Sequence, residues 1–296
     1  MKKILVTGAG GYIGSHVVAA LLDLGYPVIA SDICTSNIDR GATCITCDIF
    51  TESDAYHRLG EPDVLIHLAW RDGFVHNSQR HFDDLGRHYA FISSMIEAGV
   101  KQVSVMGSMH EIGYHEGAID ENTPQNPSSL YGIAKNALRQ SLEALQKSKN
   151  FNLNWLRGFY VCGDDSRNHS IFAKIIERAE EGAKEFPFTT GTNQYDFIDI
   201  DDLALEIALA SVQTEVNGII NCCSGTPVAL KDQVESFIQR KGLDIKLQYG
   251  VFPDRPYDSK CIYGDSTRIK QILNAYLASN SLNALPRAKE LLVKLK

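Results

Sequence analysis

The stretch Thr7-Gly8-Ala9-Gly10-Gly11-Tyr12-Ile13-Gly14 lies between a short apolar run at 4–6 and a segment with apolar residues at helical spacing, 14–24. Its glycines at 8, 11 and 14 form a G-x-x-G-x-x-G pattern between a predicted strand and a predicted helix. Small residues at such a turn let the backbone approach a pyrophosphate, and the helix N-terminus adds amide donors and a positive dipole. The stretch therefore predicts a dinucleotide-binding loop. The residues expected to contact the cofactor here are Gly8, Gly11, Tyr12, Ile13 and Gly14.

Strand-like runs alternate with helical patterns through the first half of the chain. The further runs predicted as short buried strands are 28–30, 64–69, 103–106 and 153–156, and the helical patterns are 82–98 and 131–145. Such alternation is typical of a parallel sheet covered by helices on both faces. The sequence therefore predicts an α/β fold with a Rossmann-type, doubly wound parallel sheet.

The second half of the chain is less regular. Helices are predicted at 168–181, 201–211 and 230–240, a strand at 218–223 and a loop at 251–257. The pattern changes near Gly163-Asp164-Asp165, so we expect the first domain to end there.

Composition limits the classes of function. With 29 Lys+Arg against 36 Asp+Glu, the 296-residue chain has a formal net charge of −7, and 44% of its residues are hydrophobic. This excludes wholesale disorder, and no apolar run approaches the roughly 20 residues of a membrane-spanning helix. A net negative surface repels phosphate backbones, so we expect neither nucleic acid nor membrane as a partner. The apolar stretch at the start is too short for a signal peptide, and we expect a cytoplasmic protein.

The seven cysteines do not predict a disulfide framework, because their number is odd and no export signal is visible. Cys44 and Cys47 are spaced like half of a zinc site, but no second C-x-x-C exists, and buried strand cysteines are the favoured alternative. The histidines also lack the paired helical spacing of metal ligands, so we expect no metal site.

Two acidic residues follow the next predicted strands. Asp32 comes 24 residues after Gly8, where a carboxylate would bind the adenosine ribose hydroxyls. Asp48-Ile49 follows a third short strand, where an acid could meet the adenine. Because no arginine is adjacent to Asp32, NAD(H) is favoured, and the more distant Arg40 keeps NADP(H) possible.

Tyr131-Gly-Ile-Ala-Lys135 places a phenol and an ammonium four residues apart on one helical face. Chance supplies Y-x-x-x-K in many helices, but here it follows the dinucleotide loop and a strand that ends at Ser108. Reduction of a ketone needs a proton donor beside the developing alkoxide, and a nearby cation can make a tyrosine effective near neutral pH. We expect Tyr131 to donate the proton, Lys135 to supply the cation and Ser108 to hydrogen-bond the carbonyl oxygen. Tyr131 and Lys135 are also expected to contact the cofactor, Lys135 at the nicotinamide ribose.

With these motifs in place, the sequence resembles the extended short-chain dehydrogenase/reductases of the NAD-dependent epimerase/dehydratase family, which act on nucleotide sugars. The resemblance runs through nearly the whole chain. The segments that carry it are TGAGGYIG at 7–14, Asp32, Asp48, HLA at 67–69, Ser108, YGIAK at 131–135, LR at 156–157, DFIDIDD at 196–202, NCCSG at 221–225 and RPYD at 255–258.

The resemblance implies a domain organisation and further contacts. It implies a Rossmann domain over 1–165, to which 196–228 return, and a smaller C-terminal α/β substrate domain over 166–195 and 229–296. It also implies cofactor contacts by Leu68 and Ala69, and a homodimer formed through the helices near 82–98 and 131–146.

Departures from the family pattern concern the substrate and the reaction. The dehydratases carry Asp-Glu after the catalytic Ser/Thr, whereas this chain has Met109-His110, which disfavours 4,6-dehydration. Tyr160 replaces the asparagine that typically meets the substrate's phosphate, and Tyr195 replaces the arginine of the R-D-F segment. Arg255 is then the main remaining diphosphate contact, unless it is a solvated loop arginine.

Four other residues are candidates for substrate contact. Trp70 and Phe74 stand where the family has small residues, and they either line a sugar pocket or are core aromatics. His110 and His169 either face the substrate or have a structural role.

Together these features predict NAD(P)H-dependent reduction of the C4 ketone of a nucleotide-linked, dTDP-linked in the favoured case, 4-keto-6-deoxyhexose in deoxysugar biosynthesis. The alternative is a nucleotide-sugar 4-epimerase that retains its NAD. A third hypothesis is a non-catalytic, NAD-sensing protein on the same fold, which would not need the proton donor.

Overall fold

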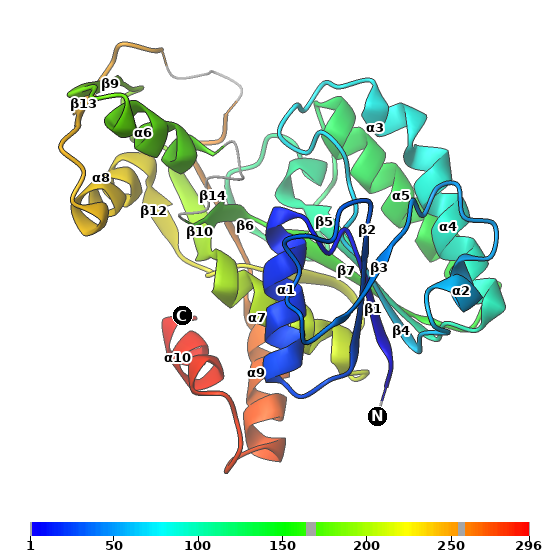
Figure 1. The fold of residues 1–296 in the computed structure, drawn as a ribbon. Helices are drawn as coiled ribbons and strands as arrows, with labels where there is room; N and C mark the ends of the chain where they lie inside the picture. The colour runs from blue at the N-terminus through cyan, green and yellow to red at the C-terminus, as the bar shows by residue number, and fades with distance from the viewer. Residues whose placement is uncertain (1, 164–169, 254–257, 296) are drawn as a thin grey trace.

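The predicted alternation of strands and helices is present in the computed structural model, which describes residues 2–163, 170–253 and 258–295 (Figure 1). The elements up to residue 158 are β1 (Ile4–Thr7), α1 (Tyr12–Asp23), β2 (Val28–Asp32), β3 (Thr43–Thr46), α2 (Ala55–Arg58), β4 (Val64–His67), α3 (Arg80–Asp83), α4 (Leu85–Ala98), β5 (Gln102–Ser108), the 3-10 helix η1 (Met109–Glu111), β6 (Gly117–Ile119), α5 (Leu130–Gln146) and β7 (Asn152–Gly158). Those that follow are β8 (Tyr160–Cys162), α6 (Ile171–Glu180), β9 (Glu185–Pro187), β10 (Gln194–Asp199), α7 (Ile200–Val212), β11 (Gly218–Cys222), β12 (Pro227–Ala229), α8 (Leu230–Lys241), β13 (Lys246–Gln248), β14 (Cys261–Gly264), α9 (Thr267–Ser279) and α10 (Pro286–Lys294).

Seven parallel strands form the main sheet, in the order β11-β7-β5-β4-β1-β2-β3. The chain builds outward from β1 through β2 to β3, then returns to place β4 on the other side of β1. At such a reversal the loops leave in opposite directions, and a crevice opens at the carboxyl ends of the strands. The predicted α/β class with a doubly wound, Rossmann-type sheet is confirmed.

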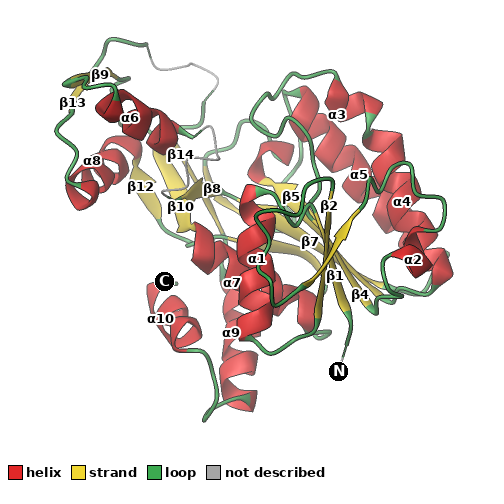
Figure 2. Cartoon of the chain, viewed as in Figure 1, coloured by secondary structure: helices red, strands yellow, loops and turns green. Residues whose placement is uncertain are grey.

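Helices cover both faces of this sheet (Figure 2). Apolar residues of α1, α7 and α9 form one core cluster on one face, and those of α4 and α5 form a second cluster on the other. Every residue of β1, β4 and β5 is buried. Burial on both faces explains why β1 and β4 begin as continuous apolar runs, at 4–6 and 64–66, rather than alternating ones.

A smaller region is built on a second sheet, in the order β12-β10-β14-β6, with β8 paired to β10. Its centre is the buried carboxylate of Asp196, which accepts hydrogen bonds from the backbone N–H groups of Ser224 (2.8 Å), Gly225 (2.9 Å) and Gly264 (3.0 Å). Asp196 therefore joins β10, the turn before β12 and β14. Helices α6 and α8 pack together beside this sheet in a separate apolar cluster.

The division into two domains at the predicted boundaries stays a prediction. Three segments of the structure lie outside the domain to which those boundaries assign them. Strand β6, from the first half of the chain, pairs with β14 in the smaller sheet. Strand β10 also lies in the smaller sheet, although α7 and β11, which follow it, belong with the parallel sheet. Helices α9 and α10 pack in the core cluster of α1 and α7, because their apolar residues cover the outer surface of α7 rather than the smaller sheet.

The helix predicted over 82–98 is interrupted at Asp84, which separates α3 from α4. The Asp84 carboxylate accepts hydrogen bonds from Arg71 Nε at 2.8 Å and Arg71 Nη2 at 2.6 Å. This contact ties the loop after β4 to the start of α4. The predicted helix at 168–181 corresponds to α6, and residues 164–169 lie outside the described residues.

All seven cysteines are free. Cys222 and Cys223 are buried, whereas Cys44 in β3 is exposed, so the expectation of a buried strand cysteine is wrong for Cys44 because β3 is the edge strand. In the described ranges, no three His, Cys, Asp or Glu residues are grouped to hold a metal ion. None of the described helices combines the length and apolarity needed to cross a membrane.

Glu206 on α7 provides a test of this packing, because it is fully buried. Burial, and then the carboxylates of Asp196 and Asp202, raise its pKa well above the ordinary 4.5. As the pH rises above the ordinary pKa of 4.5, the unfolded state releases the Glu206 proton while the folded state keeps it. Glu206 therefore lowers the free energy of unfolding increasingly as the pH rises. We expect Glu206→Gln to raise the Tm at pH 8, by roughly 2–4 °C per kcal/mol gained, and to have little effect near pH 4.

Thermal unfolding of the two proteins at both pH values measures the difference. The exposed Glu215 is the matched control, because Glu215→Gln should leave the Tm unchanged at either pH. A Glu206→Gln variant that melts below the unmodified protein at pH 8 would contradict the expectation.

Candidate active site

The loop between β1 and α1 depends on close backbone approaches that only glycine allows. Gly8 has a φ of +72°, and a Cβ there would lie 2.5 Å from Ala69 N. A Cβ at Gly14 would lie 2.0 Å from Gly8 O. Helix α1 begins after Gly11, whose backbone is the N-cap and is not supplemented by a side-chain cap. The amide groups of its first turn are therefore directed at the space in which a pyrophosphate is expected.

Gly10 is a residue that the motif does not indicate, and it connects this loop to Asp32. Its N–H donates to Asp32 Oδ2 at 2.9 Å, and a Cβ at Gly10 would lie 2.3 Å from Cys34 O. Gly10 is not one of the three glycines of the G-x-x-G-x-x-G pattern. The only sequence feature that indicates it is the adjacent pair Gly10-Gly11. The other Asp32 oxygen accepts from Cys34 N at 3.3 Å.

Residues expected around the adenosine lie at adjacent strand ends. Asp32 ends β2, and Cys47 N, just after the parallel strand β3, donates to Asp32 O at 3.0 Å. The exposed Asp48 and the buried Ile49 follow directly. Arg40 lies exposed in the loop between β2 and β3. Contacts of these residues with a cofactor stay a prediction.

The chain after β4 passes beside the glycine loop. Leu68 N donates to Thr7 O at 3.0 Å, and Ala69 N is the atom nearest to the missing Cβ of Gly8. Tyr12 and Ile13 open α1 and pack against the core cluster on that face. The structure thus brings all the residues predicted for the dinucleotide loop to one edge of the sheet.

The expected catalytic residues come together at the carboxyl end of β5. Ser108 ends that strand, and Tyr131 and Lys135 lie one turn apart on α5. The side chain of Ser129 caps α5 by accepting from Gly132 N at 3.2 Å. A Cβ at Gly132 would lie 2.3 Å from His110 O, so the first turn of α5 is pressed against η1. This approach brings Tyr131 next to Ser108.

Burial controls the ionisation of this group of residues. It raises the pKa of Tyr131 to about 12. The neighbouring Ser108 side chain opposes the rise, and the Glu111 carboxylate adds to it. Burial lowers the pKa of Lys135 to about 7, against the stabilising effect of Glu111. The expected lowering of the Tyr131 pKa is not seen, because burial is the largest cause of the shift. The role of Lys135 toward Tyr131 stays a prediction. A tyrosine with this pKa is neutral at pH 7 and carries the proton that an alkoxide needs.

Glu111 is a functional residue that was not predicted from the sequence. Its fully buried carboxylate accepts from Ser108 N at 2.6 Å and from Trp155 Nε1 at 2.9 and 3.0 Å. Arg157 Nε lies 3.8 Å from Glu111 Oε2. Glu111 thus fixes the backbone of Ser108 from behind. The spacing Ser108-x-x-Glu111 is a capping box, a signal that the sequence does contain.

Histidines surround the Tyr131 ring. His76 stacks on it with centroids 5.5 Å apart and planes at 12°, His81 lies at 5.3 Å and His110 at 6.1 Å. Burial and the neighbouring His76 lower the pKa of His110 to about 4, so His110 is neutral at pH 7. His76 and His81 carry no local sequence signal.

The residues predicted to contact the substrate differ in where the structure places them. Trp70 is half-buried, and Lys135 Nζ lies 3.8 Å from the centroid of its ring, so Trp70 covers the lysine. Phe74, on the same loop, is 57% exposed. His169 and Arg255 lie outside the described residues. The two tyrosines that depart from the family pattern, Tyr160 and Tyr195, contact each other with centroids 4.4 Å apart.

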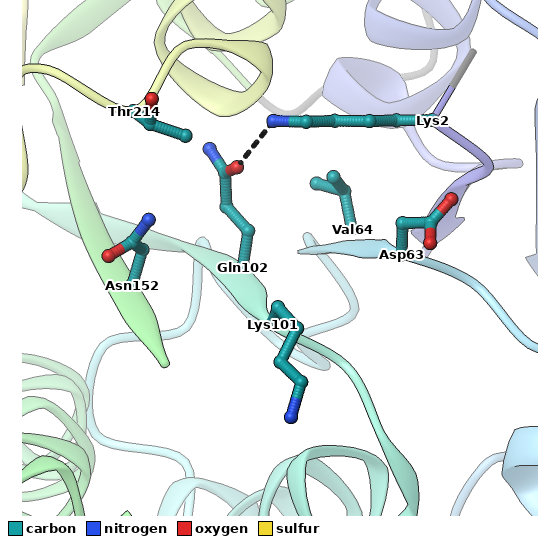
Figure 3. Close-up of a pocket in the computed structure, with 7 residues that line it drawn as sticks. All are labelled: Lys2, Asp63, Val64, Lys101, Gln102, Asn152 and Thr214. Carbon is teal, nitrogen blue, oxygen red and sulfur yellow. Dashed lines mark hydrogen bonds between the residues drawn. The ribbon is translucent and has the colours of Figure 1, made fainter. Parts of the chain in front are cut away.

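A hollow of about 510 Å³ lies at the opposite edge of the sheet, where β4 and β5 begin (Figure 3). Lys2 Nζ donates there to Gln102 Oε1 at 3.1 Å and to Val212 O at 3.2 Å. Because these polar groups satisfy one another far from Ser108 and Tyr131, we assign this hollow no part in the site.

Similarity to known proteins places the chain in a family. The model of the NAD dependent epimerase/dehydratase family matches residues 4–223. The chain belongs to this family. The match confirms the expected family and an NAD-type nicotinamide cofactor, and with it an enzyme related to nucleotide-sugar oxidoreductases and epimerases.

Individual relatives agree with this assignment. The dTDP-6-deoxy-L-talose 4-dehydrogenase (NAD(+)) of Aggregatibacter actinomycetemcomitans is 44% identical over 88% of this chain and 99% of its own length. A probable UDP-arabinose 4-epimerase of Oryza sativa subsp. japonica is 28% identical over 93% of this chain and 75% of its length.

Solved structures share the fold. UDP-glucose 4-epimerase of Thermotoga maritima with UDP-glucose superposes with a TM-score of 0.77 at 26% identity, covering 91% of each chain. MoeE5 in complex with UDP-glucuronic acid and NAD gives a TM-score of 0.78 at 25% identity, covering 92% of each chain.

Gly11 allows a test of the cofactor site that needs no substrate. Its φ of −72° is ordinary, and a Cβ there would meet only Gly8 O at 3.2 Å, so Gly11→Ala should fold with a small loss of stability. The added methyl would narrow the space at the helix N-terminus, and we expect the Kd for NADH to rise at least tenfold. Titration of NADH fluorescence measures it.

The control is Gly86→Ala. Gly86 lies on α4, away from the loop, and a Cβ at this position would have no atom within 4 Å. Equal NADH affinity in Gly11→Ala and the unmodified protein would contradict the placement of the pyrophosphate.

Proposed function

We propose that this enzyme reduces the C4 ketone of a dTDP-linked 4-keto-6-deoxyhexose with NADH. The observation that carries the proposal is the placement of Tyr131 and the buried Lys135, one turn apart on α5, beside Ser108 at the carboxyl end of β5. It is supported by the 44% identity to a dTDP-6-deoxy-L-talose 4-dehydrogenase, whose name describes a C4 reaction of the same class in the oxidative direction.

The residues around the glycine loop fit a dinucleotide. The missing side chains at Gly8, Gly10 and Gly14 make room for close backbone contacts, and Asp32 and Asp48 stand at the strand ends beside them. The residues that would hold the cofactor are Gly8, Gly11, Tyr12, Ile13, Gly14, Asp32, Asp48, Ile49, Leu68, Ala69, Tyr131 and Lys135. NAD(H), when bound, supplies the hydride equivalent for reduction at C4. Asp32 without an adjacent arginine favours NAD(H) over NADP(H).

The proton comes from this chain. Tyr131 is neutral at pH 7 and donates its hydroxyl proton to the oxygen at C4, while Ser108 orients the same oxygen. Lys135 then faces a developing phenolate, and a cation stabilises that charge more strongly in a dry site than in water. Glu111 holds Ser108 in place through its backbone N–H.

The two residues after Ser108 argue against elimination of water from the sugar. Met109 and His110 occupy the positions of the dehydratase acids, Met109 is buried and His110 is neutral. A 4-epimerase that retains its NAD is the second candidate, because it would use the same Ser108, Tyr131 and Lys135, and 4-epimerases are among the relatives.

Spectroscopy of the purified enzyme separates these functions. We expect the protein to be isolated without a full complement of NAD and to oxidise added NADH in proportion to the amount of dTDP-4-keto-6-deoxyhexose supplied. GDP- and UDP-linked 4-keto sugars in the same assay test the nucleotide. One NAD retained per chain, with no net NADH oxidation, would indicate the epimerase. NADH binding without turnover of any keto sugar would indicate a sensing protein.

In the same assay, Tyr131→Phe tests the proton donor. The variant keeps the ring that packs among the histidines but loses the hydroxyl, so kcat should fall by two or more orders of magnitude with NADH affinity nearly unchanged. Near-normal turnover in Tyr131→Phe would overturn the assignment.

We also propose a cytoplasmic homodimer. Phe82 on α3 and Ile133 on α5 are 42% and 37% exposed, on the helices from which dimerisation is expected. Sedimentation should give the mass of two chains, and replacement of both residues by serine should give that of one.

A further inference from the structure

Trp70 lies against the ammonium group of Lys135. Lys135 Nζ is 3.8 Å from the centroid of the Trp70 ring, a distance typical of a cation–π contact. The same Nζ donates to Met106 O at 2.7 Å. Lys135 is only 3% exposed, so these two contacts act in a dry environment, in which each is stronger than in water.

The orientation of Trp70 is fixed by neighbours on both helices that cover this loop. Its ring stacks on His88 of α4, with centroids 4.4 Å apart and planes at 9°. Trp70 Nε1 donates to His81 Nδ1, on α3, at 3.1 Å. These contacts leave the indole little freedom to turn toward a sugar.

His88 is itself held by His67 at the end of β4, which in turn contacts Thr7 at the end of β1. His88 Nδ1 and His67 Nε2 are 2.9 Å apart, and His67 Nδ1 lies 2.8 Å from Thr7 Oγ1. Both imidazoles are 1% exposed, and burial lowers the pKa of each, so the pair is neutral. A chain of contacts therefore runs from Thr7, beside the glycine loop, to the ring that covers Lys135.

We propose that Trp70 is a positioning residue for Lys135: its ring fixes the buried ammonium so that the N–H group used by neither Met106 nor the ring faces Tyr131 and the cofactor. The inference rests on the proposed function, because it takes the role of Lys135 from there. An ammonium has three N–H donors in a tetrahedral arrangement. With one donor on Met106 O and the π face at a second side, the direction of the remaining donor is determined. Lys135 Nζ lies 5.8 Å from the Tyr131 ring.

The ring also influences ionisation. The titratable groups that face Lys135 are Glu111 from η1, Tyr131 from its own helix, His67 from β4 and His88 from α4. Glu111 and the π face of Trp70 both favour the charged ammonium, whereas burial opposes it. Removal of the π face without admission of water should therefore make Lys135 lose its proton at a lower pH.

Three variants separate positioning from other roles. Trp70→Leu keeps the site apolar but removes the π face, Trp70→Phe keeps an aromatic face, and Val75→Ala changes an exposed side chain of the same loop. We expect Trp70→Leu to lower kcat/KM by roughly tenfold or more, mainly through kcat, and to move the alkaline limb of its pH profile to lower pH. Trp70→Phe should recover most of the rate, and Val75→Ala should match the unmodified enzyme.

Two outcomes of this assay would overturn the proposal. An increase in the KM for the sugar alone, with kcat and the pH profile unchanged, would make Trp70 a wall of the sugar pocket. Equal losses in Trp70→Leu and Trp70→Phe with unshifted pH profiles would make it a core aromatic only.

Fluorescence tests the contact independently of turnover. The chain has 2 tryptophans, and the other, Trp155, is fully buried beside Glu111. Deprotonation of Lys135 should change the emission of Trp70 with a midpoint near neutral pH, and this change should be absent in both Lys135→Met and Trp70→Phe. Persistence of the change in either variant would overturn the proposal. If no keto sugar is turned over, the proposed function fails, but this titration still decides whether Trp70 holds the ammonium.

Discussion

The burial of one ammonium group, that of Lys135, is the constraint on which the arrangement of the site depends. An isolated buried charge costs several kcal/mol, so the surrounding structure must offset it. The compensating groups come from three separate elements: Met106 O from β5, the Trp70 ring from the loop after β4, and the Glu111 carboxylate from η1. The position of Lys135 is therefore set by the sheet and its loops together, not by α5 alone.

Glu111 connects the buried Lys135 to the rest of the active site. Its carboxylate binds the backbone of Ser108 and the indole of Trp155, and it lies beside Arg157, which is fully buried as well. Removal of either charge would leave the other buried without its counter-charge, which is more costly than the original pair. Gly107 belongs to the same arrangement, because a Cβ there would lie 2.2 Å from Trp155 Nε1. The position of Ser108 is thus fixed by core packing as well as by its strand.

Much of the fold and part of the site could be predicted from the sequence, because their signals are local. A run of apolar residues indicates a strand buried on both faces, and a tyrosine four residues before a lysine indicates one helical face. The remainder depends on residues that meet only after folding. Trp70 and Lys135 are 65 positions apart, and neither the apolar run nor the Y-x-x-x-K spacing indicates that Trp70 covers Lys135. The placement of α9 and α10 beside α7 likewise follows from a surface that exists only once α7 has packed.

The two tyrosines that replace polar family residues are best explained together. Tyr160 on β8 and Tyr195 on β10 pack against each other, and Tyr160 lies 6.5 Å from His110, which in turn borders Tyr131. A continuous surface of rings therefore extends from the proton donor into the smaller region. Each of these rings also carries a hydroxyl or an imidazole nitrogen, so the row of rings combines apolar faces with groups that can hydrogen-bond.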